Sequence, residues 1–261
     1  MGRAAPATPT SAFPDLLIGI KDDGFTLPDS ITAARYSVTS HNEGTQPSHS
    51  ALGRLPDEMT QTQLESLMQD DYANAGGFTF NDIGFVGLPD WPAPGSTATG
   101  VIDLEAGTYI LFDPFGARGV VQFEVTGDLL KEPDPVADLS VDLAEMSITF
   151  PTDALVAGSH RWKVSNVGTV WHEMALLAVP DSLTGDDLLT LFSLPDDATP
   201  PPGLPALEYN PIEAVGLIAS GHTSWVDVDL APGRYVALCA APGDNGVPHV
   251  MDGMFTFFSV A

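Results

Sequence analysis

Residues 235–254 read Tyr235-Val-Ala-Leu-Cys239-Ala-Ala-Pro-Gly-Asp-Asn-Gly-Val-Pro-His249-Val-Met-Asp-Gly-Met254. The apolar run before Cys239 is typical of a strand, and the Pro, Gly, Asp and Asn residues after it indicate a loop. A cysteine thus lies at the end of a strand, a histidine lies in the loop, and a methionine follows where the next strand is expected to begin. We therefore predict that three side chains able to bind a metal converge on one strand–loop–strand unit.

The residues around this stretch occur twice in the chain. Leu230, Gly233 and Tyr235 match Leu104, Gly107 and Tyr109 at identical spacing. The same order holds upstream, where the matching pairs are Leu27-Pro28 with Phe150-Pro151, Asn42-Glu-Gly-Thr45 with Asn166-Val-Gly-Thr169, His49 with His172, and Pro56-Asp57 with Pro180-Asp181. Such self-similarity predicts two domains from one duplicated ancestor.

Most of each copy consists of short apolar or alternating segments bounded by Gly, Pro, Asn and Asp, which is typical of strands. About seven such strands per copy favour an all-β sandwich or Greek-key barrel. Thr60 and Thr184 precede leucines at helical spacing, so each copy should also carry one short helix. We predict a tail at residues 1–12, a first copy at 13–127, a linker at 128–135 and a second copy at 136–261.

The charge of the chain is strongly acidic. Its 261 residues include 35 Asp and Glu against 9 Lys and Arg, a formal net charge of −26. Such a surface repels phosphate backbones and anionic lipids, so we expect no nucleic-acid partner and no role at a membrane surface. No segment approaches the roughly 20 apolar residues of a membrane helix, so membrane insertion is not expected. The acidic residues are scattered, which fits a solvated shell and, as a hypothesis, salty surroundings.

A fourth candidate ligand lies upstream of the quoted stretch. A histidine at the start of a strand ends the stretch Asn166-Val-Gly-Thr-Val-Trp-His172. If this strand neighbours the strand–loop–strand unit, it can bring His172 close to the other three residues. A thiolate and two imidazoles with a weak axial thioether form the ligand set of a blue-copper centre. Cys239 is the single cysteine, so it has no partner for an internal disulfide.

The Cys…Pro-His-x4-Met string with an upstream Asn-x-Gly-x-x-x-His resembles the cupredoxin family of blue copper proteins. The resemblance implies two tandem cupredoxin-like β-barrels or sandwiches, with one copper ion in a type 1 site of the second copy. His172 and His249 would then be the imidazole ligands, Cys239 the thiolate and Met254 the axial thioether. Nine residues separate Cys239 from His249, which is longer than in small electron carriers and nearer to nitrite reductases.

Other residues are weighed against this set. Met251 is a weaker axial candidate, and His222, which differs between the copies, is expected at the surface. We interpret Glu173 as a solvated residue on the opposite strand face from His172. In the first copy Asp113 stands at the position of Cys239 and the ligand loop is deleted. His49 is therefore interpreted as a remnant, and the first copy as serving packing, partner binding or solubility.

The leading functional hypothesis is a one-electron transfer protein. The resemblance implies electron passage through an exposed edge of His249 within an apolar patch of Val247, Pro248 and Val250. It also implies an extracellular or periplasmic location, and the acidic surface favours a redox partner with a basic docking face.

Two other classes stay open, and nothing in the sequence fixes the oligomeric state. A two-domain copper oxidoreductase is less favoured, because the chain has no His-x-His or His-Cys-His motif. An enzyme is accordingly less expected than a carrier. A non-redox binding or structural module of the same fold remains the third class, since fold alone does not imply function.

Overall fold

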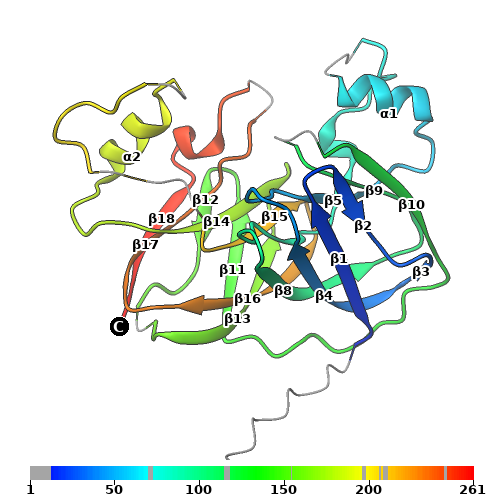
Figure 1. The fold of residues 1–261 in the computed structure, drawn as a ribbon, viewed down its shortest axis with the longest axis horizontal. Helices are drawn as coiled ribbons and strands as arrows, with labels where there is room; N and C mark the ends of the chain where they lie inside the picture. The colour runs from blue at the N-terminus through cyan, green and yellow to red at the C-terminus, as the bar shows by residue number, and fades with distance from the viewer. Residues whose placement is uncertain are drawn as a thin grey trace, which may run out of the picture.

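The protein is described from a computed structural model that covers residues 13–69, 73–114, 118–153, 155–195, 198–205, 207, 211–243 and 246–261. The tail predicted at residues 1–12 lies outside these ranges. The described chain is built mainly of strands and has two short α-helices, so the predicted all-β fold with two short helices is confirmed (Figure 1).

One long sheet runs through the molecule, and strands from both predicted copies contribute to it. Its eight strands lie in the order β12-β11-β13-β16-β8-β4-β1-β2. The first copy contributes β1 (Asp15–Lys21), β2 (Gly24–Thr26), β4 (Ala34–Asn42) and β8 (Thr97–Leu104), and the second contributes β11 (Leu139–Ala144), β12 (Ser147–Thr149), β13 (Gly158–Asn166) and β16 (Thr223–Leu230).

Two five-stranded sheets complete the architecture. One has the order β3-β10-β9-β5-β6 and comprises β3 (Ile31–Thr32), β5 (Ala51–Arg54), β6 (Gly84–Phe85), β9 (Gly107–Phe112) and β10 (Val120–Thr126). The other has the order β18-β17-β14-β15-β7 and comprises β7 (Pro89–Asp90), β14 (His172–Ala178), β15 (Glu213–Ile218), β17 (Gly233–Leu238) and β18 (Phe255–Val260).

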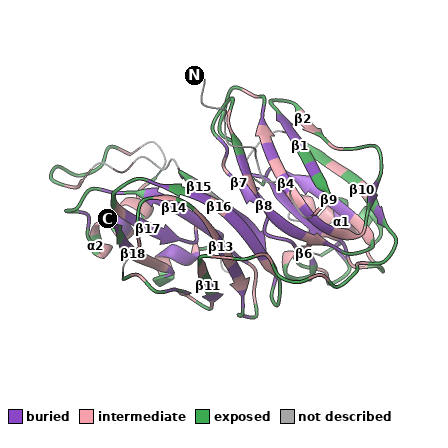
Figure 2. Ribbon diagram, turned by 90° about the horizontal axis from the view of Figure 1, so that it is seen from below, coloured by how far each residue is buried: buried purple, intermediate pink, exposed green. Residues whose placement is uncertain are grey.

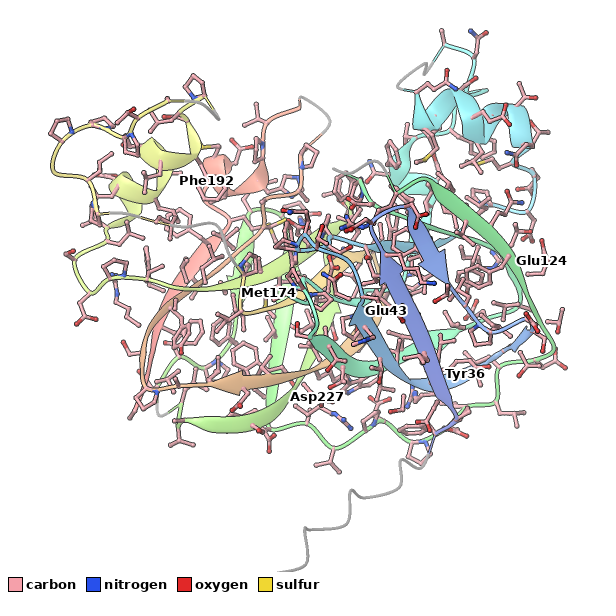
Figure 3. All side chains as sticks on the ribbon, in the orientation of Figure 1. Tyr36, Glu43, Glu124, Met174, Phe192 and Asp227 are labelled. Carbon is pink, nitrogen blue, oxygen red and sulfur yellow. The ribbon has the colours of Figure 1, made fainter. Side chains whose placement is uncertain are left out.

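The core lies between the long sheet and the five-stranded sheets, where strands carry unbroken or alternating buried residues (Figure 2). Trp162 and Trp225 are the largest fully buried side chains. Met174 of β14 is fully buried, whereas Glu124 of β10 projects at the outer edge of the molecule (Figure 3). This distribution follows from the gain of removing apolar surface from water.

Each copy carries one capped helix at the predicted place. In α1 (Gln61–Met68) Thr60 and Gln63 form a capping box, and in α2 (Gly185–Phe192) Thr184 and Asp187 do the same. The reciprocal bonds satisfy backbone N–H groups at the start of the helix. Two short 3₁₀ turns, η1 (Phe80–Asp82) and η2 (His249–Asp252), complete the elements.

The repeated sequence motifs correspond to repeated hydrogen bonds. The hydroxyl groups of Tyr109 and Tyr235 each donate to a carbonyl four residues upstream, at Glu105 and Ala231. The tyrosines therefore fix the turns that enter β9 and β17, which explains why the Leu-x-x-Gly-x-Tyr motif occurs twice.

The repeated asparagines hold matching turns after β4 and β13. Asn42 donates to the Gln46 and Pro92 carbonyls and accepts from the Gly44 N–H. Asn166 donates to the Val170 and Ile218 carbonyls and accepts from the Gly168 N–H. In the second copy this turn leads directly to His172.

The two copies meet edge to edge in the long sheet. Strands β8 and β16 pair antiparallel, with Val101 opposite Trp225 and Gly100 opposite Val226. A β carbon at Gly100 would overlap the Trp225 carbonyl oxygen, so this approach requires glycine.

A second junction joins the copies on the other side. Strand β7 of the first copy pairs with β15 of the second, which makes β7 an edge strand of the second copy's sheet. The division of the chain into two domains at 128–135 stays a prediction, but the main-chain pairing shows that the two copies are closely joined.

Candidate metal centre

Three predicted ligands come together at the loop end of the second copy. His172 is the first residue of β14, Cys239 directly follows β17, and His249 is the first residue of η2. All three are buried, with exposed fractions of 0%, 0% and 2%. Among the described residues they form the one group of three or more His, Cys, Asp or Glu side chains whose donor atoms converge.

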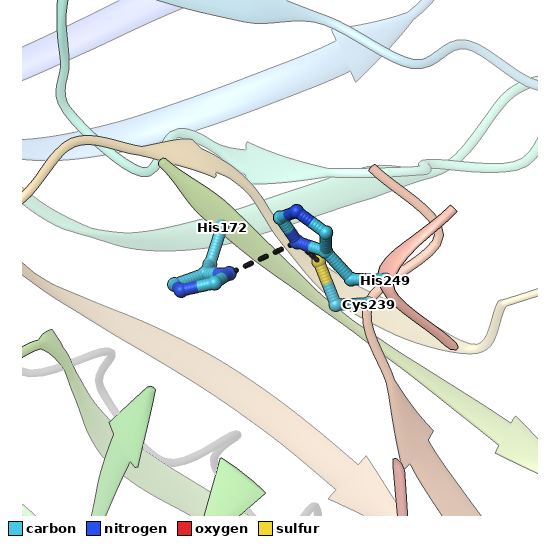
Figure 4. A group of neighbouring side chains, drawn as sticks. All are labelled: His172, Cys239 and His249. Atoms are coloured by element: carbon cyan, nitrogen blue, oxygen red, sulfur yellow. Dashed lines mark hydrogen bonds between the residues drawn. The ribbon is translucent and has the colours of Figure 1, made fainter. Parts of the chain in front are cut away.

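The donor atoms lie close enough to share one ion. The Nδ1 atoms of His172 and His249 are 3.1 Å apart, and Cys239 Sγ is 3.5 Å from His249 Nδ1 (Figure 4). One ligand atom from each residue lies within 4.8 Å of the others. Metal bonds of about 2.0–2.1 Å to nitrogen and about 2.3 Å to sulfur place donor atoms roughly 3–4 Å from one another. The donor set therefore fits a single ion bound by two imidazoles and one thiolate.

Main-chain hydrogen bonds lock the strand–loop–strand unit. Cys239 N–H donates to the Met254 carbonyl at 3.1 Å, and Met254 N–H donates to the His249 carbonyl at 3.0 Å. Val250 N–H in turn donates to the Cys239 carbonyl at 2.8 Å. The cysteine, histidine and methionine positions are thus tied to one another by backbone bonds and do not depend on a metal for their spacing.

Burial sets the protonation of two of the candidate ligands. Burial, together with the His249 charge, lowers the pKa of His172 to about 4, so this imidazole is neutral and can act as a ligand. Burial also raises the pKa of the Cys239 thiol, with the Glu173 charge adding to the effect. A bound cation supplies the positive charge that the thiolate needs, because metal binding and thiol deprotonation are linked.

The fourth predicted ligand, Met254, is fully buried in the same core cluster as Cys239. Its role as the axial thioether remains a prediction. Met251, the weaker candidate, packs in a different cluster beside α2. The loop residue between them, Gly253, has φ +95, which lets the chain turn from η2 into β18.

The interpretation of Glu173 as solvated is wrong. The residue is 2% exposed, and its Oε1 accepts a hydrogen bond from Ala240 N–H at 3.1 Å. Its backbone N–H donates to Cys239 Sγ at 3.4 Å. Its other carboxylate oxygen, Oε2, lies 3.3 Å from His49 Nε2 of the first copy, so the contact between the two copies buries this side chain.

His49 is not an isolated remnant either. Its Nδ1 contacts the Asp90 carboxylate, and its Nε2 lies 3.3 Å from Glu173 Oε2. Burial alone would lower the pKa of His49, but the Asp90 and Glu173 charges outweigh it and raise the pKa to about 9. Burial raises the pKa of Glu173. This buried chain of charges could not be predicted from the sequence, because it forms only where the two copies meet.

The exposed apolar patch predicted for Val247, Pro248 and Val250 beside His249 is only partly at the surface. Val250 is fully buried and packs near α2, so of the three apolar residues Val247 is exposed and Pro248 half-buried. His249, at 2% exposure, has no open edge at the surface. It instead lines a pocket of about 280 Å³ with Trp171, whose ring centroid is 6.3 Å from that of His249.

The remaining histidines take no part in the group. His222 is exposed, as expected, and its Nδ1 lies 3.2 Å from the Ser220 carbonyl oxygen. His160 Nε2 lies 2.8 Å from the Val156 carbonyl oxygen. Neither helix in the described part of the chain is long and apolar enough to cross a membrane.

The fold and the buried group define an all-β protein with a candidate centre of two histidines and one cysteine. No family model matches the chain, and no curated protein does. Among solved structures it is similar to an auracyanin from Roseiflexus castenholzii, with 21% identity over 47% of this chain and 94% of that one, at a TM-score of 0.32.

Auracyanin A, described as a "blue" copper protein from Chloroflexus aurantiacus, is 20% identical over 47% of this chain and 99% of that one, at a TM-score of 0.30. A multicopper oxidase is 14% identical over 95% of this chain and 88% of that one, at a TM-score of 0.27. The low identities and TM-scores are those of distant similarity.

Proposed function

We propose that the chain binds one copper ion in a type 1 site formed by His172, Cys239, His249 and the axial Met254, and that it acts as a one-electron transfer protein. The observation that carries this proposal is the convergence of two imidazole nitrogens and one sulfur within 4.8 Å in a fully buried place. A thiolate with two imidazoles is the donor set of blue-copper sites.

Bound copper would supply a centre that gains and loses one electron, and the chain supplies its surroundings. The three side chains stand on elements fixed by main-chain bonds, so the donor positions should change little between oxidation states. The Glu173 N–H at 3.4 Å from Cys239 Sγ stabilises charge on the sulfur. Burial of all three donors keeps water from the centre.

The route outward in this proposal passes through Trp171. This indole is half-buried, its ring centroid lies 6.3 Å from that of His249, and it lines two pockets. An electron acceptor or donor seated over Trp171 and Val247 would come within a short distance of His249.

We further propose that the partner is a redox protein with a basic docking face, met in an extracellular or periplasmic space. The net charge of −26 supports the choice of partner. Because such attraction is screened, association should slow markedly when ionic strength rises from 0.01 to 0.2 M, over which the Debye length falls from about 30 Å to below about 10 Å.

The site is tested by adding Cu(II) to the purified full-length chain and recording the visible absorption spectrum. We expect an intense thiolate-to-copper band that is absent in Cys239→Ser and in His249→Gln, while His222→Gln, a surface control, keeps it. A folded chain that binds copper without this band would contradict the type 1 site. A folded chain that binds no copper would favour the non-redox module.

A further inference from the structure

The threonine of the repeated Asn-x-Gly-Thr motif contacts a carboxylate from an earlier turn of the chain. In the second copy, Glu145 Oε1 accepts hydrogen bonds from the Thr169 N–H and, at 2.8 Å, from the Thr169 hydroxyl group. In the first copy, Asp22 accepts from the Thr45 N–H at 2.7 Å and from the Thr45 hydroxyl group at 3.0 Å. The motif therefore binds a carboxylate in both copies.

The glycine of the motif makes room for this carboxylate. A β carbon at position 168 would lie 2.8 Å from Glu145 Oε1, and one at position 44 would lie 2.6 Å from Asp22 Oδ1. Both distances are too short for a real contact, so any larger residue than Gly168 or Gly44 would displace the carboxylate. The motif thus occurs twice because asparagine closes the turn, glycine admits the carboxylate and threonine donates to it.

Strand pairing brings Glu145 to the motif. Strand β11 runs parallel to β13 with Leu143 opposite Asn166, and the Val167 N–H donates to the Leu143 carbonyl at 2.8 Å. Glu145 lies two residues farther along, in the turn between β11 and β12. The backbone of this hairpin therefore places the carboxylate beside residues 168–170.

The carboxylate of the second copy reaches farther than that of the first. Glu145 has one more methylene group than Asp22 and also accepts from the Val170 N–H, at 3.4 Å. Val170 stands two residues before His172, the first residue of β14. Hydrogen bonds from the Thr169 backbone and hydroxyl group lower the pKa of Glu145 to about 2, so the carboxylate is ionised and its bonds are charge-assisted. A side chain from outside the turn thus holds the segment that leads into the candidate metal centre.

We infer that Glu145 is a positioning residue for His172, because its carboxylate fixes residues 169–170 and with them the place of the imidazole. In its consequence for copper this inference rests on the proposed function, whereas the hydrogen bonds of Glu145 do not involve the metal. Residues that orient metal ligands typically change metal affinity about 10–100-fold when they are replaced. Glu145 acts through the main chain, so we expect the lower end of this range.

The test compares Glu145→Ala, Glu145→Gln and Asp22→Ala in the full-length chain, each titrated with Cu(II) against a chelator of known affinity. We expect Glu145→Ala to weaken copper binding about tenfold and to change the thiolate-to-copper band, and Asp22→Ala, the matched control, to leave both unchanged. Glu145→Gln should keep most of the affinity, because the amide oxygen can accept the same hydrogen bonds.

Two outcomes of this titration would overturn the inference. Equal copper affinities of Glu145→Ala and Asp22→Ala would show that the contacts in the second copy do not position a ligand. A Glu145→Gln variant as weak as Glu145→Ala would show that only the charge of the side chain matters. Urea unfolding of each variant checks that the two Ala variants are compared as folded chains.

A measurement on the metal-free chain separates this inference from the proposed function. Proton NMR records the imidazole resonances of His172 and the exchange rate of the Thr169 amide. We expect Glu145→Ala to shift the His172 resonances and to speed exchange at Thr169 about tenfold, and Asp22→Ala to leave both unchanged. If these changes appear while the wild type gives no thiolate-to-copper band, the proposed copper site fails and the positioning of His172 stands. Unshifted His172 resonances in Glu145→Ala would overturn the inference whether or not copper binds.

Discussion

His49 and His172 lie one residue apart in the register of the repeat and have opposite chemistry. Around His172 the neighbours are apolar groups and another imidazole, which favour the neutral ring and a pKa of about 4. Around His49 two carboxylates favour the charged ring and a pKa of about 9. Two adjacent positions of the repeat thus carry a candidate ligand in one copy and a buried cation in the other, and the neighbouring side chains account for the difference in pKa.

The His49 environment predicts a pH-dependent stability. Its pKa is about 6.5 when unfolded and about 9 when folded, so its contribution is fully present below pH 6.5 and is lost as the pH rises through 9. At one pKa unit per about 1.4 kcal/mol, the loss is on the order of 3 kcal/mol. Urea unfolding of the metal-free chain at several pH values between 6 and 10 measures it.

The control for this prediction is a pair of histidine variants. His49→Gln should remove the pH-dependent loss, whereas His222→Gln, at an exposed position, should retain it. A wild-type free energy of unfolding that stays constant between pH 6.5 and 9.5 would contradict the charged state of His49.

At the level of elements, the turn at Asn166 connects a repeated motif to the candidate metal centre. Its side chain makes three hydrogen bonds that hold residues 166–170, two positions before His172. Asn42 makes the equivalent three bonds in the first copy, where no metal ligand follows. Asn42 and Asn166 can therefore be compared directly, because the same substitution at each should have different consequences for the metal centre.

Replacing these asparagines should separate stability from metal binding. Asn166→Ala and Asn42→Ala should each cost about 2–3 kcal/mol of unfolding free energy, because buried backbone groups lose their partners. Only Asn166→Ala should also weaken copper binding and alter the visible spectrum, since His172 is less firmly placed. Equal copper affinity and identical spectra for the two variants would show that the turn does not position the ligand.

Elements that depend on contacts between residues close in the sequence could be predicted, whereas contacts between the two copies could not. The capped helices at Thr60 and Thr184 follow from short-range hydrogen bonds, and the grouping of Cys239 with His249 follows from one strand–loop–strand unit. The burial of Glu173 depends on β7 joining the sheet of the other copy. No local pattern encodes that pairing, so a residue expected in water lies inside the molecule.

At the scale of the whole molecule, the long sheet shows why the first copy matters although it lacks the cysteine. It supplies β7 to the sheet that contains β14, and β8 to the strand pair at the centre of the long sheet. Its His49 and Asp90 hold Glu173, whose backbone N–H reaches Cys239 Sγ. The first copy therefore forms part of the surroundings of the candidate metal centre.

The tightest main-chain contact between the copies predicts how strongly they depend on each other. A β carbon at Gly100 would meet the Trp225 carbonyl oxygen and lie 2.7 Å from Pro89 Cγ, so Gly100→Ala must push β8 away from β16. Overpacking of this kind typically costs about 1–3 kcal/mol, and the loss of strand pairing adds to it.

Gly24→Ala is the control, because the atom nearest to a β carbon at position 24 would be 3.7 Å away, an ordinary contact distance. We expect urea unfolding to shift to lower concentration for Gly100→Ala alone, and circular dichroism and tryptophan fluorescence to stop coinciding as the copies begin to unfold separately. A Gly100→Ala chain as stable and as cooperative as the wild type would mean that β8 and β16 do not pair in solution.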